Sequence, residues 1–274
     1  MQDEVLCTAG PLGAGHTGLV AHDRSTGFRP SANGFAFANS WPSGPAVSIP
    51  LAVGSIGIGN PARGLCGGMV FAALDYWHAA MTPPDAQPAA GTPLFRFIVR
   101  RLVESWRLPV GVARYYRWML LPDGDLPPRV PGTLATLATW RPGVARRTTA
   151  RQWPRVKALI DAGVPAPLGI VTVRSANPLL LGANHQVLGY GYSVADTSVL
   201  LHVYDPNTGP DDSVSISFDA AATAPMFRHN LGLQLPVRGF FLSRYSPARP
   251  PSPGRPRIRS RQPRGPRAAG TPSG

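Results

Sequence analysis

The residues of this chain that could do chemistry are a cysteine, a histidine and an acid or amide, in that order along the sequence. Cys66 lies in the segment GLCGGM, at the start of an apolar run with helical spacing. The first turn of a helix presents unpaired N–H groups and the positive end of the helix dipole, and both favour a thiolate over a thiol. Cys66 is therefore a candidate nucleophile, and the alternative is a small buried hydrophobic residue.

A thiol nucleophile needs a base within hydrogen-bond reach, and that base needs a partner that fixes its orientation. His185 is the best candidate base, because it lies in the segment NHQVLGYGY, where it would open a strand. Asp205 and Asn207 lie in VYDPN, at the end of the next predicted strand, and either could orient the imidazole. The same two residues could instead build an Asx turn around the intervening proline.

The predicted hairpin brings these side chains together. If its turn is formed by residues 195–197, the numbers of opposed residues sum to 392. His185 then lies opposite Asn207, and Asp205 lies opposite Val187, one diagonal from His185 on the same face. A register slip of one residue would turn Asp205 to the other face, so the register decides whether the site forms.

The elements expected to position these residues are helices in the first part of the chain and strands in the second. Helical spacing predicts a helix over residues 65–80 that carries Cys66, a helical block over 92–121, and a helix from Thr149 to Ala162. Strand-like segments are expected at residues 34–39, 168–173, 185–194, 199–204, 214–218 and 237–244. Helices followed by an antiparallel sheet indicate an α+β fold.

Composition divides the chain into three parts. Residues 1–33 are rich in Gly, Ser, Thr and Pro and are expected to be a loosely ordered segment ahead of a domain at 34–245. Residues 246–274 hold seven arginines and no acid, lack apolar periodicity, and are expected to be disordered. Part of the net charge of +13 thus belongs to this tail, and nonspecific binding of anions by the tail is one candidate function.

The sequence also limits the class of protein. Two cysteines are too few for a disulfide-framed secreted module. The N-terminus lacks the pattern of a signal peptide, and no run of about 18 apolar residues occurs, so we expect a cytoplasmic protein without a transmembrane segment, with export by another route left open. The histidines outside the site show no ligand spacing, and the letters GxGxxG at 13–18 follow no strand, so neither a metal nor a cofactor is expected.

The three segments GLCGGM, NHQVLGYGY and VYDPN resemble the papain-like cysteine peptidase superfamily, and in particular bacterial proteins of mostly unknown function within it. The resemblance implies a central helix that carries the cysteine and packs on an antiparallel sheet, with a helical insertion. It implies Cys66 as nucleophile, His185 as general base and then acid, and Asp205 as orienting residue, with Asn207 as the competing assignment. The family places a glutamine six residues before the cysteine to bind the oxyanion, and Asn60 occupies that position here.

Two features of the sequence depart from the peptidase pattern. Gly67 follows the cysteine where the family has an aromatic residue, and Asn60 is one methylene shorter than glutamine. The expected function is a thiol hydrolase, either a cysteine peptidase or an amide hydrolase, that acts on a peptide or amide through an acyl-enzyme. The alternatives are a catalytically inactive binding protein of the same fold and an anion-binding protein that acts through its basic tail.

Overall fold

The structure is a computed structural model that describes residues 22–41, 65–106, 110–126 and 141–252, and the backbone of two short strands at 47–50 and 55–58. The helices are α1 (Pro30–Asn33), α2 (Cys66–His78), α3 (Pro93–Trp106), α4 (Val110–Met119), α5 (Val144–Arg147) and α6 (Trp153–Asp161), with a π-helical turn (Thr148–Gln152) and a 3₁₀ helix (Pro178–Ala183). The strands are β1 (His22–Ser25), β2 (Val47–Pro50), β3 (Ser55–Ile58), β4 (Ala166–Val171), β5 (His185–Ala195), β6 (Ser198–Tyr204), β7 (Ser215–Asp219), β8 (Arg228–His229) and β9 (Gly239–Leu242).

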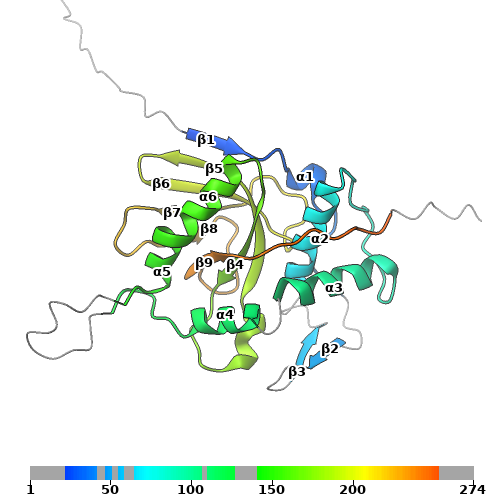
Figure 1. Ribbon diagram of the computed structural model, residues 1–274, viewed down its shortest axis with the longest axis horizontal. Coiled ribbons are helices and arrows are strands. Elements are labelled where there is room, and N and C mark those ends of the chain that lie inside the picture. Colours follow the sequence, from blue (N-terminus) through cyan, green and yellow to red (C-terminus); the bar gives the residue numbers. More distant parts are fainter. Residues whose placement is uncertain are drawn as a thin grey trace, which may run out of the picture.

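The main element is a seven-stranded antiparallel sheet with the strand order β8-β7-β6-β5-β4-β9, in which β1 pairs with the second half of β5. The sheet curls between two groups of helices (Figure 1). Leu188 and Tyr204 pack on one face in a core with α2 and α3, whereas Val187 and Val203 pack on the other face in a core with α6. The predicted α+β class is confirmed, and the cysteine-bearing helix packs against the sheet as expected.

Most of the predicted elements are present. The helix predicted at 65–80 is α2, and the helical block at 92–121 consists of α3 and α4. The five strands predicted after residue 165 correspond to β4, β5, β6, β7 and β9, with ends that differ by a few residues. These are the segments whose apolar spacing is set by burial on a helix stripe or a sheet face, and this explains why the pattern found them.

Two local predictions were wrong. Residues 34–39 form bends and no strand, because Phe35 and Phe37 are buried in the core and not paired along a sheet edge. The helix predicted to start at Thr149 already begins at Val144, in α5, and passes through the π-helical turn into α6. Thr149 therefore lies inside the helical run, where its hydroxyl donates to the carbonyl of Ala145 at 3.4 Å and caps nothing.

The ordered structure extends beyond both predicted domain boundaries. β1 and α1 lie within the segment expected to be loose, because β1 is held by pairing with β5. Residues 243–252, which we call the C-terminal strap, cross α2 after β9 (orange in Figure 1) although disorder was expected from residue 246. The rest of the predicted tail, residues 253–274, lies outside the described part of the chain.

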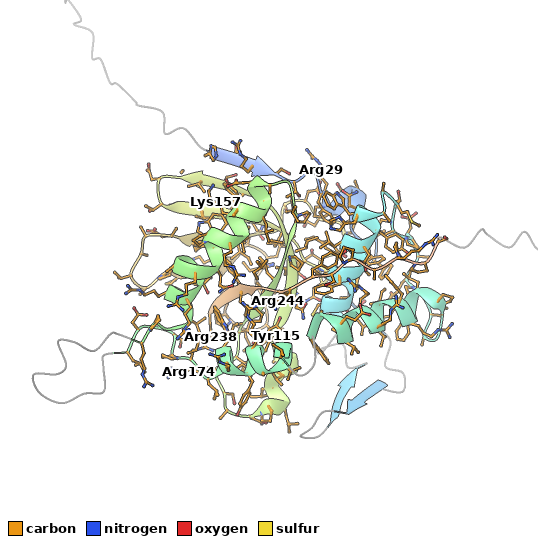
Figure 2. All side chains as sticks on the ribbon, in the orientation of Figure 1. Arg29, Tyr115, Lys157, Arg174, Arg238 and Arg244 are labelled. Carbon is orange, nitrogen blue, oxygen red and sulfur yellow. The ribbon has the colours of Figure 1, made fainter. Side chains whose placement is uncertain are left out.

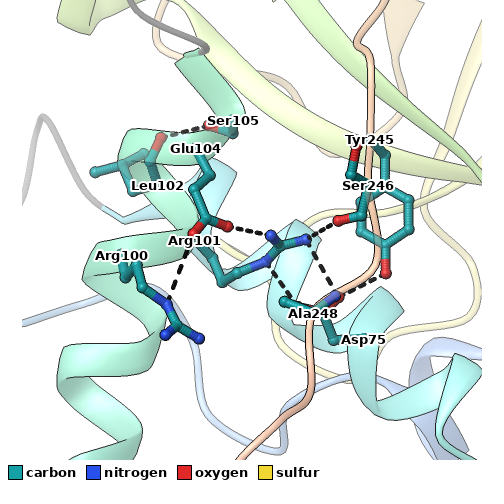
Figure 3. A network of polar contacts seen from close by, with 9 residues as sticks. All are labelled: Asp75, Arg100, Arg101, Leu102, Glu104, Ser105, Tyr245, Ser246 and Ala248. Atoms are coloured by element: carbon teal, nitrogen blue, oxygen red, sulfur yellow. Dashed lines mark hydrogen bonds and ion pairs between the residues drawn. The ribbon is translucent and has the colours of Figure 1, made fainter.

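A buried ion pair explains why the strap is held. Arg101 of α3 lies with its Nε 2.7 Å from Asp75 Oδ2 of α2, and both side chains are almost inaccessible to solvent (Figure 3). The strap completes the coordination, because the Tyr245 hydroxyl and the Ala248 N–H donate to Asp75 Oδ1 at 2.6 and 2.8 Å. Arg101 in turn donates to the Ser246 carbonyl at 2.8 Å. The composition of the tail gives no sign of these partners, since they lie on helices far away in sequence.

Gly68 permits the close approach of α2 and α3. A Cβ at this position would lie 2.2 Å from the backbone carbonyl oxygen of Ile98, an atom that cannot move aside. Gly68→Ala is therefore expected to lower the free energy of unfolding by about 1–3 kcal/mol, as overpacking does, even though alanine favours a helix. Chemical denaturation measures this change. Gly124→Ala is the matched control, because nothing lies within 4 Å of its added Cβ, and equal stability of the two variants would contradict the packing argument.

Candidate functional site

Cys66 is the first residue of α2 and is a partly exposed free cysteine. The helix start is fixed by Asn39, whose side-chain Oδ1 accepts hydrogen bonds from the Leu65 N–H at 2.8 Å and the Trp41 indole N–H at 3.0 Å. Asn39 is itself buried. The helix dipole and the first-turn N–H groups of α2 therefore point at the cysteine, as the sequence predicted.

A β-bulge sets the position of the other two residues. The structure pairs Ala195 with Ser198, so the turn has two residues, and opposed residue numbers near it sum to 393, not 392. The register then shifts between Gly189 and Gly191, and beyond the bulge Leu188 pairs with Tyr204, which restores the sum of 392. The predicted turn was wrong by one residue, and the predicted sum of 392 nevertheless holds for the pairs of β5 and β6 that lie nearest the site.

The bulge has a direct effect on the faces of the sheet. Without it, Asp205 would oppose Leu188, whose side chain points to the α2 core, and it would lie on the face opposite to His185. β1 holds the bulge in place, because the Thr26 N–H and hydroxyl donate to the Tyr190 carbonyl at 2.9 and 3.0 Å. One extra residue in β5 therefore turns Asp205 toward His185.

His185 and Asp205 form a buried pair. His185 Nε2 lies 2.8 Å from Asp205 Oδ1, and the side chains are 9% and 1% exposed. Burial alone would lower the pKa of His185, but the Asp205 carboxylate and the nearby Cys66 side chain raise it well above its ordinary value. Burial alone would raise the pKa of Asp205, and His185 outweighs it and holds that pKa well below its usual range. The pair therefore favours an imidazolium beside a carboxylate.

The ring geometry assigns the two nitrogens of His185. Because Nε2 faces Asp205, Nδ1 is the nitrogen available to the Cys66 sulfur. The backbone of His185 is also fixed, since the hydroxyl of Tyr115, on α4 (Figure 2), donates to its carbonyl at 3.1 Å. Burial raises the pKa of Tyr115 well above its ordinary value, so this hydroxyl stays protonated and remains a donor.

Asn207 makes contacts other than the one proposed for an orienting residue. Its N–H donates to Asp205 Oδ1 at 2.8 Å, which is the Asx turn considered from the sequence. Its side-chain Oδ1 accepts from Asn39 Nδ2 at 3.0 Å, and this bond ties the end of β6 to the start of α2. Of the two candidates, Asp205 is the one in contact with the imidazole. Asn60 lies outside the described residues.

Two residues near the site were missed by the sequence analysis. His229 lies in β8 with its Nε2 3.2 Å from Asp205 Oδ2, although it was dismissed for lack of ligand spacing. Asn39 was considered only as the end of a strand. Their partners lie 24 residues before His229 and 26 residues after Asn39, so no local pattern could have joined them. For His229, the only signal in the sequence would have been a histidine next to an alternating strand segment.

A cleft of about 140 Å³ opens beside the cysteine and the histidine. Its apolar walls come from Leu102, Trp106, Val112, Leu181, Leu233 and Leu235. The polar lining comes from the side chains of Asn39, Asn184, Gln186, Asn207 and Gln234. None of the described residues that line the cleft is Asp, Glu, Lys or Arg, so its chemistry suits an uncharged ligand.

The glycine after the cysteine has a packing role. A Cβ at Gly67 would lie 2.6 Å from the side-chain nitrogen of Gln186, which follows the histidine in β5. The Gln186 amide also donates to the Ser105 hydroxyl at 3.2 Å. The absence of a side chain at Gly67 therefore leaves room for the amide of Gln186, which relates this departure from the peptidase pattern to packing.

Comparison with known proteins gave no match: no family model, no curated protein and no solved structure is similar to this chain. Among the residues that the structure describes, no three His, Cys, Asp or Glu side chains gather as a metal site would require. No helix in the described ranges is long and apolar enough to cross a membrane.

Proposed function

We propose that this protein is a papain-like thiol hydrolase that cleaves a peptide or amide bond through an acyl-enzyme. The observation that carries the proposal is the arrangement of three side chains, of which Cys66 and His185 line one cleft and Asp205 lies buried behind the histidine. The cysteine starts a helix that packs on an antiparallel sheet, the histidine starts a strand, and the acid follows the next strand and contacts the histidine at 2.8 Å. Order, elements and contacts match what the resemblance to papain-like enzymes implies.

The charges of the site fit this chemistry. The mechanism requires a thiolate at Cys66, and an imidazolium stabilised by Asp205, together with the helix start, supplies the positive surroundings that a thiolate needs. The thiolate attacks the carbonyl carbon, and the oxyanion forms next to the N–H of Cys66. His185 then gives its Nδ1 proton to the leaving amine, and the acyl group stays on sulfur as a thioester.

Hydrolysis of the thioester completes the cycle. Neutral His185 takes a proton from a water molecule, the resulting hydroxide attacks the thioester carbonyl, and the sulfur leaves as the thiolate. Asn60 as a second oxyanion donor remains a prediction from the resemblance. The uncharged lining of the cleft supports a neutral substrate with an apolar group near the scissile bond.

A thiol-directed acyl probe tests the proposal. The wild-type protein is expected to react at a single site, and Cys66→Ser and His185→Ala are expected to abolish labelling, as read by intact mass. His202→Ala is the control, because this histidine lies on β6 and contacts Ser193 instead of the site. Equal labelling of all four proteins would contradict a catalytic thiol and favour the inactive binding protein.

A further inference from the structure

We propose that His229 is a positioning residue that holds the second oxygen of Asp205, so that the first oxygen stays aimed at His185. This inference rests on the proposed function of the same site. It extends the arrangement from three residues to four, and the fourth lies on β8, at the opposite edge of the sheet from β4 and β9.

The contact lies in the interior of the protein. His229 Nε2 is 3.2 Å from Asp205 Oδ2, and the two side chains are 2% and 1% exposed. The separation is that of an ion pair or a charge–dipole contact, whereas the direction of Nε2–H departs from the line that a full hydrogen bond needs.

The two carboxylate oxygens of Asp205 have different surroundings. Oδ1 accepts from His185 Nε2 and from the Asn207 N–H, both at 2.8 Å. Oδ2 has no hydrogen-bond donor among the described residues, and His229 Nε2 is the only cationic or ring nitrogen that lies within ion-pair range of it there. A buried carboxylate oxygen without a donor is costly, so the proposal assigns the N–H of the His229 ring to Nε2, the nitrogen that faces this oxygen.

The backbone around His229 is fixed. His229 pairs with Ile216 of β7. The next residue, Asn230, accepts from the Ser215 N–H at 2.9 Å and donates through its side-chain amide to the Ser213 carbonyl at 2.8 Å. These bonds hold the backbone of His229 at one place relative to β6 and β7. From this fixed backbone the imidazole faces Asp205.

The chain after His229 leads directly to the substrate cleft. Residues 233–235 line the cleft, four to six residues after the histidine. The carboxylate that orients the catalytic histidine is therefore attached, through His229, to the segment that forms one wall. Packing alone would not need an imidazole here, because a phenyl ring would fill a similar volume without a polar edge.

Alkylation of Cys66 by iodoacetamide, measured as a function of pH in a Cys7→Ser background, tests the inference. The wild-type site is expected to react at a nearly constant rate between about pH 6 and pH 8, as a thiolate–imidazolium pair does. His229→Phe is expected to lower the rate near pH 6 at least fivefold, and His229→Gln, which retains a donor, is expected to recover part of it. His202→Phe is the matched control and should leave the profile unchanged.

A second measurement separates positioning from folding. Long-range ¹H–¹⁵N spectra of the histidine rings report the protonation of His185. His229→Phe is expected to shift the ring signals of His185, while the thermal midpoint of unfolding falls only moderately. If His229→Phe does not fold, the same spectra of His229→Gln decide the question. If the pH profile of Cys66 alkylation and the ring signals of His185 match those of the wild type in both variants, the inference is overturned. A wild-type profile of an ordinary thiol would instead overturn the proposed function.

Discussion

Asp205→Ala is expected to lower the rate at which Cys66 is acylated near pH 6 by about 10²- to 10⁴-fold, the range attributed to a positioned acid or base. Without the carboxylate, His185 loses the acceptor at 2.8 Å that fixes its ring and stabilises its positive form. The thiolate then loses its counterion, and the imidazole can turn Nδ1 away from sulfur. Stopped-flow acylation with an activated ester measures the effect, with His202→Ala as the control histidine variant.

Asp205→Asn separates orientation from charge. The amide oxygen can still accept from His185 Nε2, so the acylation rate is expected to lie between those of the wild type and the alanine variant. The charge is lost, and the pKa of His185 is expected to fall. If Asp205→Ala acylates as fast as the wild type, the carboxylate has no part in the reaction and the proposed mechanism is wrong.

The same pair makes the stability of the protein depend on pH. The pKa of Asp205 is depressed in the folded state, so its contribution is present above the unfolded value near 3.9 and is lost as the pH falls through the folded value. The pKa of His185 is raised, so its contribution is complete below about 6.5 and is lost as the pH rises through the folded value. Asp205→Ala should therefore destabilise the fold most between about pH 4 and pH 6.5.

Arg101→Met is expected to lower the free energy of unfolding by about 3–5 kcal/mol, because it removes one partner of a buried pair and leaves Asp75 without its counterion. The Arg101 side chain is 3% exposed and that of Asp75 is inaccessible, so water cannot take the place of the guanidinium. The guanidinium also lies over the rings of Phe71 and Tyr245, at 5.1 and 5.3 Å. Methionine retains much of this packing volume and loses the charge.

Equilibrium denaturation measures this loss, and the chain offers a matched control. Arg100 is the neighbouring arginine on α3, but its side chain is 57% exposed and it faces Glu104 at 3.7 Å. Arg100→Met is expected to cost less than about 1 kcal/mol, as surface pairs do. The double variant Arg101→Met with Asp75→Asn should recover part of the stability, because no uncompensated charge remains. Similar losses for the two single arginine variants would refute the role of the buried pair.

The sequence predicted the elements of the site better than their connections. Helical and strand spacing located α2 and β5, and the order of Cys66, His185 and Asp205 identified two residues that line the cleft and the acid that contacts the histidine. From a turn that was one residue too long, the hairpin arithmetic gave the sum of 392 that the structure has at Leu188 and Gly189. The bulge in β5 shifts the register by one residue and so compensates for the error in the turn. No feature of the local sequence predicts this bulge.

The remaining contacts depend on tertiary structure. Asn39 fixes the start of α2 from a segment without regular structure, and His229 reaches Asp205 from a two-residue strand. The C-terminal strap is ordered despite its Pro- and Arg-rich composition, because Asp75 and Arg101 provide buried partners for its backbone. Side chains that find partners across the sheet, or between helices, leave no periodic pattern in the sequence.

The strap also holds Pro251 at the end of α2 that is far from Cys66. The hydroxyl of Tyr76 donates to the Pro251 carbonyl at 2.9 Å, near the end of α2, while Cys66 begins the same helix. Ten residues of helix separate these points by about 15 Å, and the Debye length at physiological salt is about 8 Å. Pro251 therefore lies well beyond one screening length from the helix start, measured along the axis of α2. A charged group attached at this point of the strap would be screened from the Cys66 thiol at physiological salt.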